Sequence, residues 1–203
     1  MNARIGLRIG TLLAVVLLTL FALDRWRAQQ EANDPLAWKQ QYQASLWMPL
    51  RERLLTLADV ERVLGQGSLW MISADGEPKL VTRHSMASDG QQWLVQAVIA
   101  LDEQQTASLV EAQAWQPGIP DQPVSPAVGA ALAQYPVERL SLMPDEALKT
   151  IRIVATFGPA DWQMPVDEGE AWVYGREGVV VSVSGEQAYS IMFGLRQDIP
   201  GAE

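Results

Sequence analysis

The sequence predicts an α+β fold in which an N-terminal transmembrane helix precedes two modules, each with one helix and a three-stranded antiparallel sheet. Three observations lead to this prediction. An apolar run lies near the N-terminus, two groups of strand-like segments are separated by turn residues, and a helix-like segment precedes each group. With 48% hydrophobic and 19% charged residues, the chain can bury a core.

The apolar run covers residues 9–23 without a charge, and Trp26 follows it where an interfacial aromatic side chain would lie. A cleavable signal peptide needs small residues before its cleavage site, but the best candidate here has Leu20 at the first small position. We therefore expect an uncleaved signal-anchor over residues 1–27, with a cleaved signal peptide and a buried helix as alternatives. The expected membrane-spanning residues are Ile9, Leu12, Leu13, Val15, Val16, Leu17, Leu18, Leu20, Phe21 and Leu23.

The arginines on the two sides of this run bear on its orientation. Arg4 and Arg8 precede the run, and Arg25 and Arg27 follow it with Asp24 between them. This distribution and the short N-terminal tail favour a cytoplasmic N-terminus. The sequence thus predicts a single-pass protein of a bacterial inner membrane, with the C-terminal domain in the periplasm.

Charge and cysteine content exclude several classes of function. The formal net charge is −9, and residues 1–27 are basic, so the rest is more acidic than the whole chain. Such a surface repels phosphate backbones, so we expect no nucleic-acid partner. The absence of cysteine excludes disulfides, thiol catalysis, cysteine-ligated metals and a lipoprotein anchor.

Residues 28–55 are predicted to form a juxtamembrane linker and an amphipathic helix that is interrupted or restarted at Pro49. Apolar side chains recur there at steps of three and four. Trp38 and Trp47 could lie at the membrane surface or pack on the domain that follows.

The first module is predicted over residues 56–115. Thr56 and Asp59 have the spacing of a capping box, and Gly65 is placed to end the helix. Asp-Gly pairs separate the strand-like runs that follow. The expected elements after this helix are strands at 68–73, 79–86 and 93–101 and a second helix at 104–115.

Four prolines make residues 116–126 a stiff connection to a second module over residues 127–203. An Ala-rich helical run comes first. Pro144 then suits the first turn of a helix that starts at Met143 and reaches at least Thr150. Residues 151–157 fit either a helix or a strand, and Gly158 ends the segment. The expected strands are 170–174, 179–183 and 189–195, so the two halves suggest a tandem repeat.

In the second half, Phe157-Gly158-Pro159 follows a helix and Trp172-Val173-Tyr174 lies in a strand. With these motifs the second half resembles the SmpA/OmlA (BamE-like) family of small envelope modules, whereas the first half matches only at its helix end. The resemblance implies a non-enzymatic envelope protein that binds other proteins. Members of this family are usually lipid-anchored, and this chain lacks the cysteine that such an anchor needs.

Two polar features of the sequence are candidates for catalytic or metal sites. His84 is the single histidine, so we expect a hydrogen-bonded or surface side chain, because a triad or metal site needs partners that the sequence does not indicate. Asp167, Glu168 and Glu170 could act as paired carboxylates or bind calcium, but a solvated loop is the expected interpretation.

Eight tryptophans are many for 203 residues. Most are expected in the core, yet exposed aromatic side chains beside an acidic rim would form a protein-binding face. The candidate interaction residues are Trp115, Trp162, Trp172 and Tyr174. Trp172 and Tyr174 lie two apart in a strand, so their rings share one face, and we expect Trp172 in the core.

These features predict an anchored, non-enzymatic envelope protein that binds an unidentified partner in an assembly, adaptor or inhibitor-like role. No cofactor or metal is expected, and the oligomeric state stays open. The alternative is a cell-wall hydrolase that uses acidic residues. A pocket lined by converging carboxylates would favour the hydrolase, and an aromatic sheet face would favour the binding protein.

Overall fold

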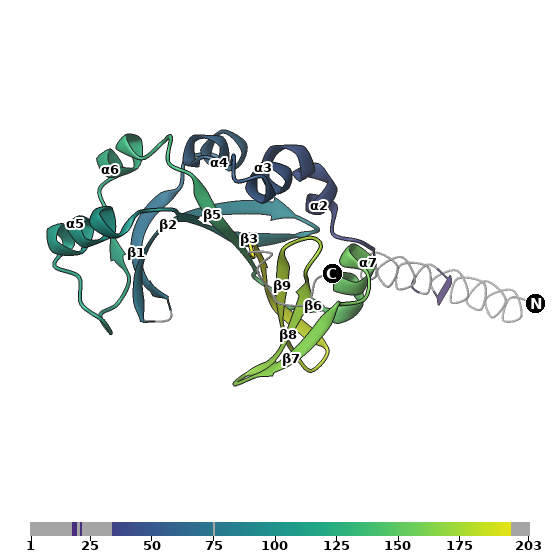
Figure 1. Ribbon diagram of the computed structural model, residues 1–203. Helices are drawn as coiled ribbons and strands as arrows, with labels where there is room; N and C mark the ends of the chain where they lie inside the picture. Colours follow the sequence, from purple (N-terminus) through teal and green to yellow (C-terminus); the bar gives the residue numbers. More distant parts are fainter. Residues whose placement is uncertain (1–17, 20, 22–33, 75, 196–203) are drawn as a thin grey trace, which may run out of the picture.

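The computed structural model describes residues 18–19, 21, 34–74 and 76–195 (Figure 1). The helical elements are α2 (Ala37–Gln41), the π-helix η1 (Gln43–Trp47), α3 (Met48–Arg51), α4 (Leu57–Leu64), α5 (Glu103–Gln113), α6 (Pro126–Ala131) and α7 (Thr150–Phe157). The strands are β1 (Ser68–Ala74), β2 (Glu77–Ser88), β3 (Gln91–Ile99), β4 (Gln122–Pro123), β5 (Val137–Pro144), β6 (Leu148–Lys149), β7 (Trp162–Val166), β8 (Gly169–Tyr174), β9 (Val179–Ser184) and β10 (Gln187–Phe193).

The described strands form one ten-stranded sheet in the order β4-β1-β2-β3-β5-β10-β9-β8-β7, and the short β6 pairs with β10. Every pairing is antiparallel. The predicted fold class of two modules with separate three-stranded sheets is therefore wrong. The physical reason is β5, which pairs with β3 at Leu142–Val95 and with β10 at Leu142–Ile191. Because β5 lies between β3 and β10, it joins the two groups of strands into one sheet, and β3 and β10 are each paired on the side that faces the other group.

The predicted strand segments are present as β1, β2, β3, β8, β9 and β10, but the helix predicted over 143–150 is wrong up to Lys149. Met143 and Pro144 instead end β5, where Pro144 lies opposite Trp93. Helix α7 begins only at Thr150 and ends at Gly158, whose φ is 81°. Residues 151–157, for which the sequence fitted two structures, are helical.

The sheet bends into an arch, and the labelled helices lie along its outer side; within the described residues, the inner side carries no helix (Figure 1). A large core cluster lies between the helices and the outer face around Trp38, which is fully buried. The rings of Trp47, Trp93 and Phe193 have centroids 5.4, 5.5 and 5.9 Å from that of Trp38. Trp38 and Trp47 thus pack on the domain.

A smaller core cluster lies beneath α5 and α6, around Met71 and Leu80. Trp115 and Val124, at opposite ends of the Pro-rich stretch, are both buried in it. Between them, β4 pairs with β1 through Gln122–Met71. Residues 116–126 therefore pack back on the first half of the chain.

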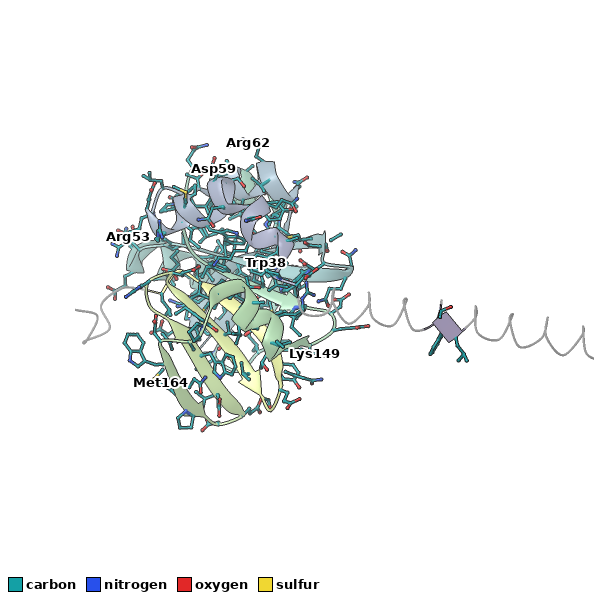
Figure 2. The ribbon with its side chains drawn as sticks, turned by 90° about the vertical axis from the view of Figure 1, so that its right-hand side faces the viewer. Trp38, Arg53, Asp59, Arg62, Lys149 and Met164 are labelled. Atoms are coloured by element: carbon teal, nitrogen blue, oxygen red, sulfur yellow. The ribbon has the colours of Figure 1, made fainter. Side chains whose placement is uncertain are left out.

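Helix α4 begins with the predicted capping box. The Thr56 hydroxyl accepts from the Asp59 backbone N–H at 3.3 Å, and the Asp59 carboxylate accepts from the Thr56 N–H at 3.1 Å. Hydrogen bonds from Thr56, together with Arg62, lower the pKa of Asp59. Asp59 and Arg62 lie on the outer side of the molecule (Figure 2). The helix ends at Gly65, at a φ of 84° that favours glycine.

Asp89, in the turn between β2 and β3, ties three parts of the chain together. Its carboxylate pairs with Arg152 of α7 at 2.8 Å and accepts from the Ala37 backbone N–H at 3.0 Å. The side chains of Asp89 and Arg152 are only 4% and 12% exposed. Lys39 adds a second link, because its ammonium donates to the Thr156 carbonyl at 3.0 Å.

Within the described residues, no helix is both long enough and apolar enough to cross a membrane. This finding corrects the predicted transmembrane signal-anchor and the single-pass inner-membrane location with a periplasmic domain. A span needs about 20 apolar residues, whereas α5, the longest helix with described bounds, has 11. Leu18 and Phe21 are helical and exposed. The other predicted spanning residues lie outside the described part: Ile9, Leu12, Leu13, Val15, Val16, Leu17, Leu20 and Leu23.

Candidate functional site

Strand β7 forms one end of the sheet and pairs on one side only, with β8. In the part of the chain that the structure describes, no strand covers its other side. All five residues of β7 are exposed, in contrast to the alternating burial of β9. An uncovered strand edge presents backbone N–H and C=O groups that can pair with another chain.

Three apolar side chains of β7 alternate along the strand and therefore share one face of the sheet. They are Trp162, Met164 and Val166, and we call them the β7 stripe. Their exposed fractions are 39%, 50% and 52%. Met164 lies at the margin of the molecule, well away from the central Trp38 (Figure 2). A row of exposed apolar side chains on an uncovered strand edge is a candidate contact surface.

Contacts with the neighbouring turn fix the start of β7. The Asp161 N–H donates to the Val173 carbonyl at 2.9 Å, and the Asp161 carboxylate accepts from the Gly175 N–H at 2.8 Å. A Cβ on Gly175 would lie 3.0 Å from the Trp162 ring, so the far end of the indole packs against this glycine. Trp162 therefore contacts the turn after β8 although it is partly exposed.

The turn after β7 is acidic and tightly folded. Gly169 has a φ of 137°, and a Cβ there would lie 2.2 Å from the Val183 carbonyl oxygen, so only glycine fits. Asp167, Glu168 and Glu170 are exposed around it. Among the described residues, none of these three carboxylates nor Asp161 forms an ion pair. The β7 stripe is thus flanked by negative charge at both ends.

The opposite face of the same strands points into the core. Trp172 is half-buried against the large core cluster, and its indole N–H donates to Glu170 at 2.9 Å. Tyr174 is buried beside Phe157, with ring centroids 5.3 Å apart. Burial raises the pKa of Tyr174 to about 12, and the charges of Asp161 and Glu177 act in the same direction.

The four predicted interaction residues therefore do not form one surface. Trp115 and Tyr174 are buried, in separate core clusters. Trp172 and Tyr174 share one face, and Trp162 lies on the other face of the same sheet end. Trp162 alone of the four is exposed.

His84 is buried in β2 and fully hydrogen-bonded. Its Nδ1 lies 2.9 Å from the Gly65 carbonyl, and its Nε2 lies 2.9 Å from the Thr82 hydroxyl. These partners assign the neutral ring with its proton on Nδ1, because a carbonyl can only accept. Burial lowers the pKa of His84, against smaller opposing effects of the Gly65 hydrogen bond and the Glu61 charge. The ring acts as a structural link between β2 and the end of α4.

A pocket of about 410 Å³ lies between α5 and the sheet. Its apolar lining includes Leu80, Ile99 and Val110, and three glutamates also line it: Glu77, Glu103 and Glu138. Among the described residues, no three histidine or acidic side chains are placed to hold a metal ion. The carboxylates of Asp167, Glu168 and Glu170 are exposed in the turn after β7 and do not line this pocket.

At the other end of the sheet, on β1 and β2, the inner face differs from the β7 stripe. Other side chains of the same chain cover the apolar side chains there. The Arg83 guanidinium lies 4.8 Å from the ring centroid of Trp70 and pairs with Asp121. Val81, next to Trp70 in the ladder, is consequently fully buried. No such cover lies over the β7 stripe among the described residues.

Met164 and Val166 were not predicted from the sequence, whereas Trp162 was named as a candidate interaction residue. A local signal exists, because apolar residues alternate in Trp162-Gln163-Met164-Pro165-Val166. Proline is disfavoured inside a central strand but is compatible with an edge strand such as β7.

Comparisons with protein-family models, curated proteins and solved structures find no match to this chain.

Proposed function

We propose that this chain is a non-catalytic protein-binding domain with an adaptor, assembly or inhibitor-like role. The observation that carries the proposal is the β7 stripe, three exposed apolar side chains on a strand edge that nothing covers among the described residues. The packing of Trp162 against Gly175 supports it, because an aromatic ring that already has a packing partner loses less entropy on binding than a ring without one.

The resemblance to SmpA/OmlA modules supports the same class of function, since those modules bind other proteins. The residues of that resemblance lie next to the proposed surface: Gly158 precedes β7, and Trp172 and Tyr174 belong to its partner strand β8. The family assignment itself stays a prediction.

The test is affinity capture from the native cells with the tagged full-length chain and two matched variants. Met164→Lys places a charge in the β7 stripe, and Tyr189→Lys places one on exposed Tyr189 of β10 in the same half of the sheet. We expect a partner that the wild type and Tyr189→Lys retain and Met164→Lys loses. Both variants should melt within about 2 °C of the wild type, as surface substitutions do. Equal capture by both variants would contradict the proposal.

A further inference from the structure

The charges around β7 disfavour pairing of this strand with its own copy. In a two-fold antiparallel pair centred on Met164, Asp161 of one copy would lie opposite Asp167 of the other, and this contact would occur twice. Like charges directly opposite each other destabilise a strand pair. Between residues 161 and 177 the chain carries five carboxylates and a single guanidinium, that of Arg176.

The same charges favour a basic partner. Glu177 is neutralised by Lys39 at 2.8 Å, whereas Asp161, Asp167, Glu168 and Glu170 form no ion pair among the described residues. A positively charged group at each end of an incoming strand would meet a negative group, and such complementarity steers association and fixes register.

We propose that the β7 edge binds an extended segment of a partner protein by strand addition. In that segment, apolar residues alternate along one face and lysine or arginine flanks both ends. This inference rests on the proposed function and specifies its mode. Backbone pairing along the free edge aligns the segment, and its apolar side chains pack beside the β7 stripe.

Pro165 limits how much the backbone contributes. It has no N–H to donate, so the short edge offers fewer hydrogen bonds than a strand of the same length without proline. Side-chain packing on the stripe and the flanking charges must then supply most of the selectivity. This predicts that changes in charge affect binding as strongly as changes in the stripe.

The test uses the full chain and a short synthetic peptide in which valine alternates with threonine between lysine pairs. A second peptide carries glutamate pairs instead. Binding is followed by isothermal titration and by backbone amide NMR shifts. We expect the lysine peptide to bind, with shifts centred on β7, and the glutamate peptide to bind at least about tenfold more weakly.

Matched variants locate the contact. Two variants should each bind the lysine peptide about tenfold more weakly than the wild type. One is the double variant Asp167→Lys and Glu168→Lys, and the other is Met164→Thr. Glu186→Lys in the turn between β9 and β10, and Tyr189→Thr on β10, should leave binding unchanged. Three results would overturn the inference. The two peptides could bind equally well, the amide shifts could be centred away from β7, or the chain could form a concentration-dependent dimer that Met164→Thr abolishes. If cellular capture still depends on Met164 while the lysine peptide fails, strand addition is wrong and the proposed function stands.

Discussion

At the residue scale, His84 shows how one buried ring couples a strand to a helix end. The Gly65 carbonyl and the Thr82 hydroxyl satisfy both ring nitrogens, and a Cβ on Gly67 would lie 2.5 Å from the ring. Gly67 therefore leaves the space that the imidazole fills. The sequence predicted a hydrogen-bonded or surface His84, but its long-range partners at Gly65 and Gly67 leave no local pattern.

This burial predicts a pH-dependent stability. The pKa of His84 is lowered in the folded chain from the ordinary value of about 6.5. The contribution of neutral His84 to the free energy of unfolding is fully present above about pH 6.5. It is lost as the pH falls through the lowered folded pKa, because the unfolded chain binds more protons than the folded chain in this range. Urea unfolding between about pH 5 and pH 8 measures this loss. His84→Gln cannot titrate at this position, so its free energy of unfolding should fall less steeply with decreasing pH than that of the wild type. Parallel pH curves for the two proteins would contradict the account.

A second prediction at this scale concerns the pair of Arg152 and Asp89. Arg152→Met leaves the buried Asp89 carboxylate without its ion partner, so we expect a loss of about 3 kcal/mol in the free energy of unfolding. The control is Arg62→Met, which removes an exposed pair with Asp59 and should cost less than about 1 kcal/mol. Chemical denaturation compares the two, and equal losses would mean that Asp89 does not depend on Arg152.

At the element scale, the two faces of the β7–β8 hairpin have separate roles. Trp172 faces the core cluster, and the β7 stripe lies on the opposite, exposed face of the sheet. Local patterns predicted most strands and the capping box of α4, because side-chain alternation and capping are short-range signals. They failed at Met143 and Pro144, where a helix-start pattern is overridden by pairing with β3. They gave no prediction for β7, a five-residue strand that Pro165 interrupts.

Stability measurements should separate these two faces. Trp172→Ala should lower the free energy of unfolding by about 2 kcal/mol. This is less than the roughly 3–5 kcal/mol typical of a fully buried tryptophan, because the Trp172 ring is half-buried. Met164→Ala should change stability by less than about 0.5 kcal/mol, as exposed positions usually do. Thermal melts of the two variants provide the comparison. An unchanged midpoint for Trp172→Ala would place its ring outside the core.

At the scale of the whole molecule, the single sheet replaces the two modules that the sequence suggested. The pairing of Leu140 with Phe193, and of Leu142 with Ile191, joins residues about 50 positions apart in the chain. Strand alternation shows which side chains share a face, but it does not show which strands lie side by side. The order of the sheet was therefore beyond local sequence patterns.

One continuous sheet predicts one unfolding transition. Both halves share the junction of β5 with β10 and the large core cluster, so neither should unfold alone. Scanning calorimetry of the full chain should give a calorimetric enthalpy equal to the van't Hoff enthalpy. Two resolved transitions, each assigned to one half, would show that the halves are independent.

The central claim is that the β7 edge is the surface that contacts a partner protein. Amide hydrogen exchange of the full chain, with and without the partner that cellular capture provides, measures this most directly. The account predicts slower exchange in the complex at the β7 amides, of which Pro165 has none, because amides on the free edge become paired or covered. Unchanged exchange in β7, with slower exchange at the inner face near Trp70 or around the pocket under α5, would contradict it.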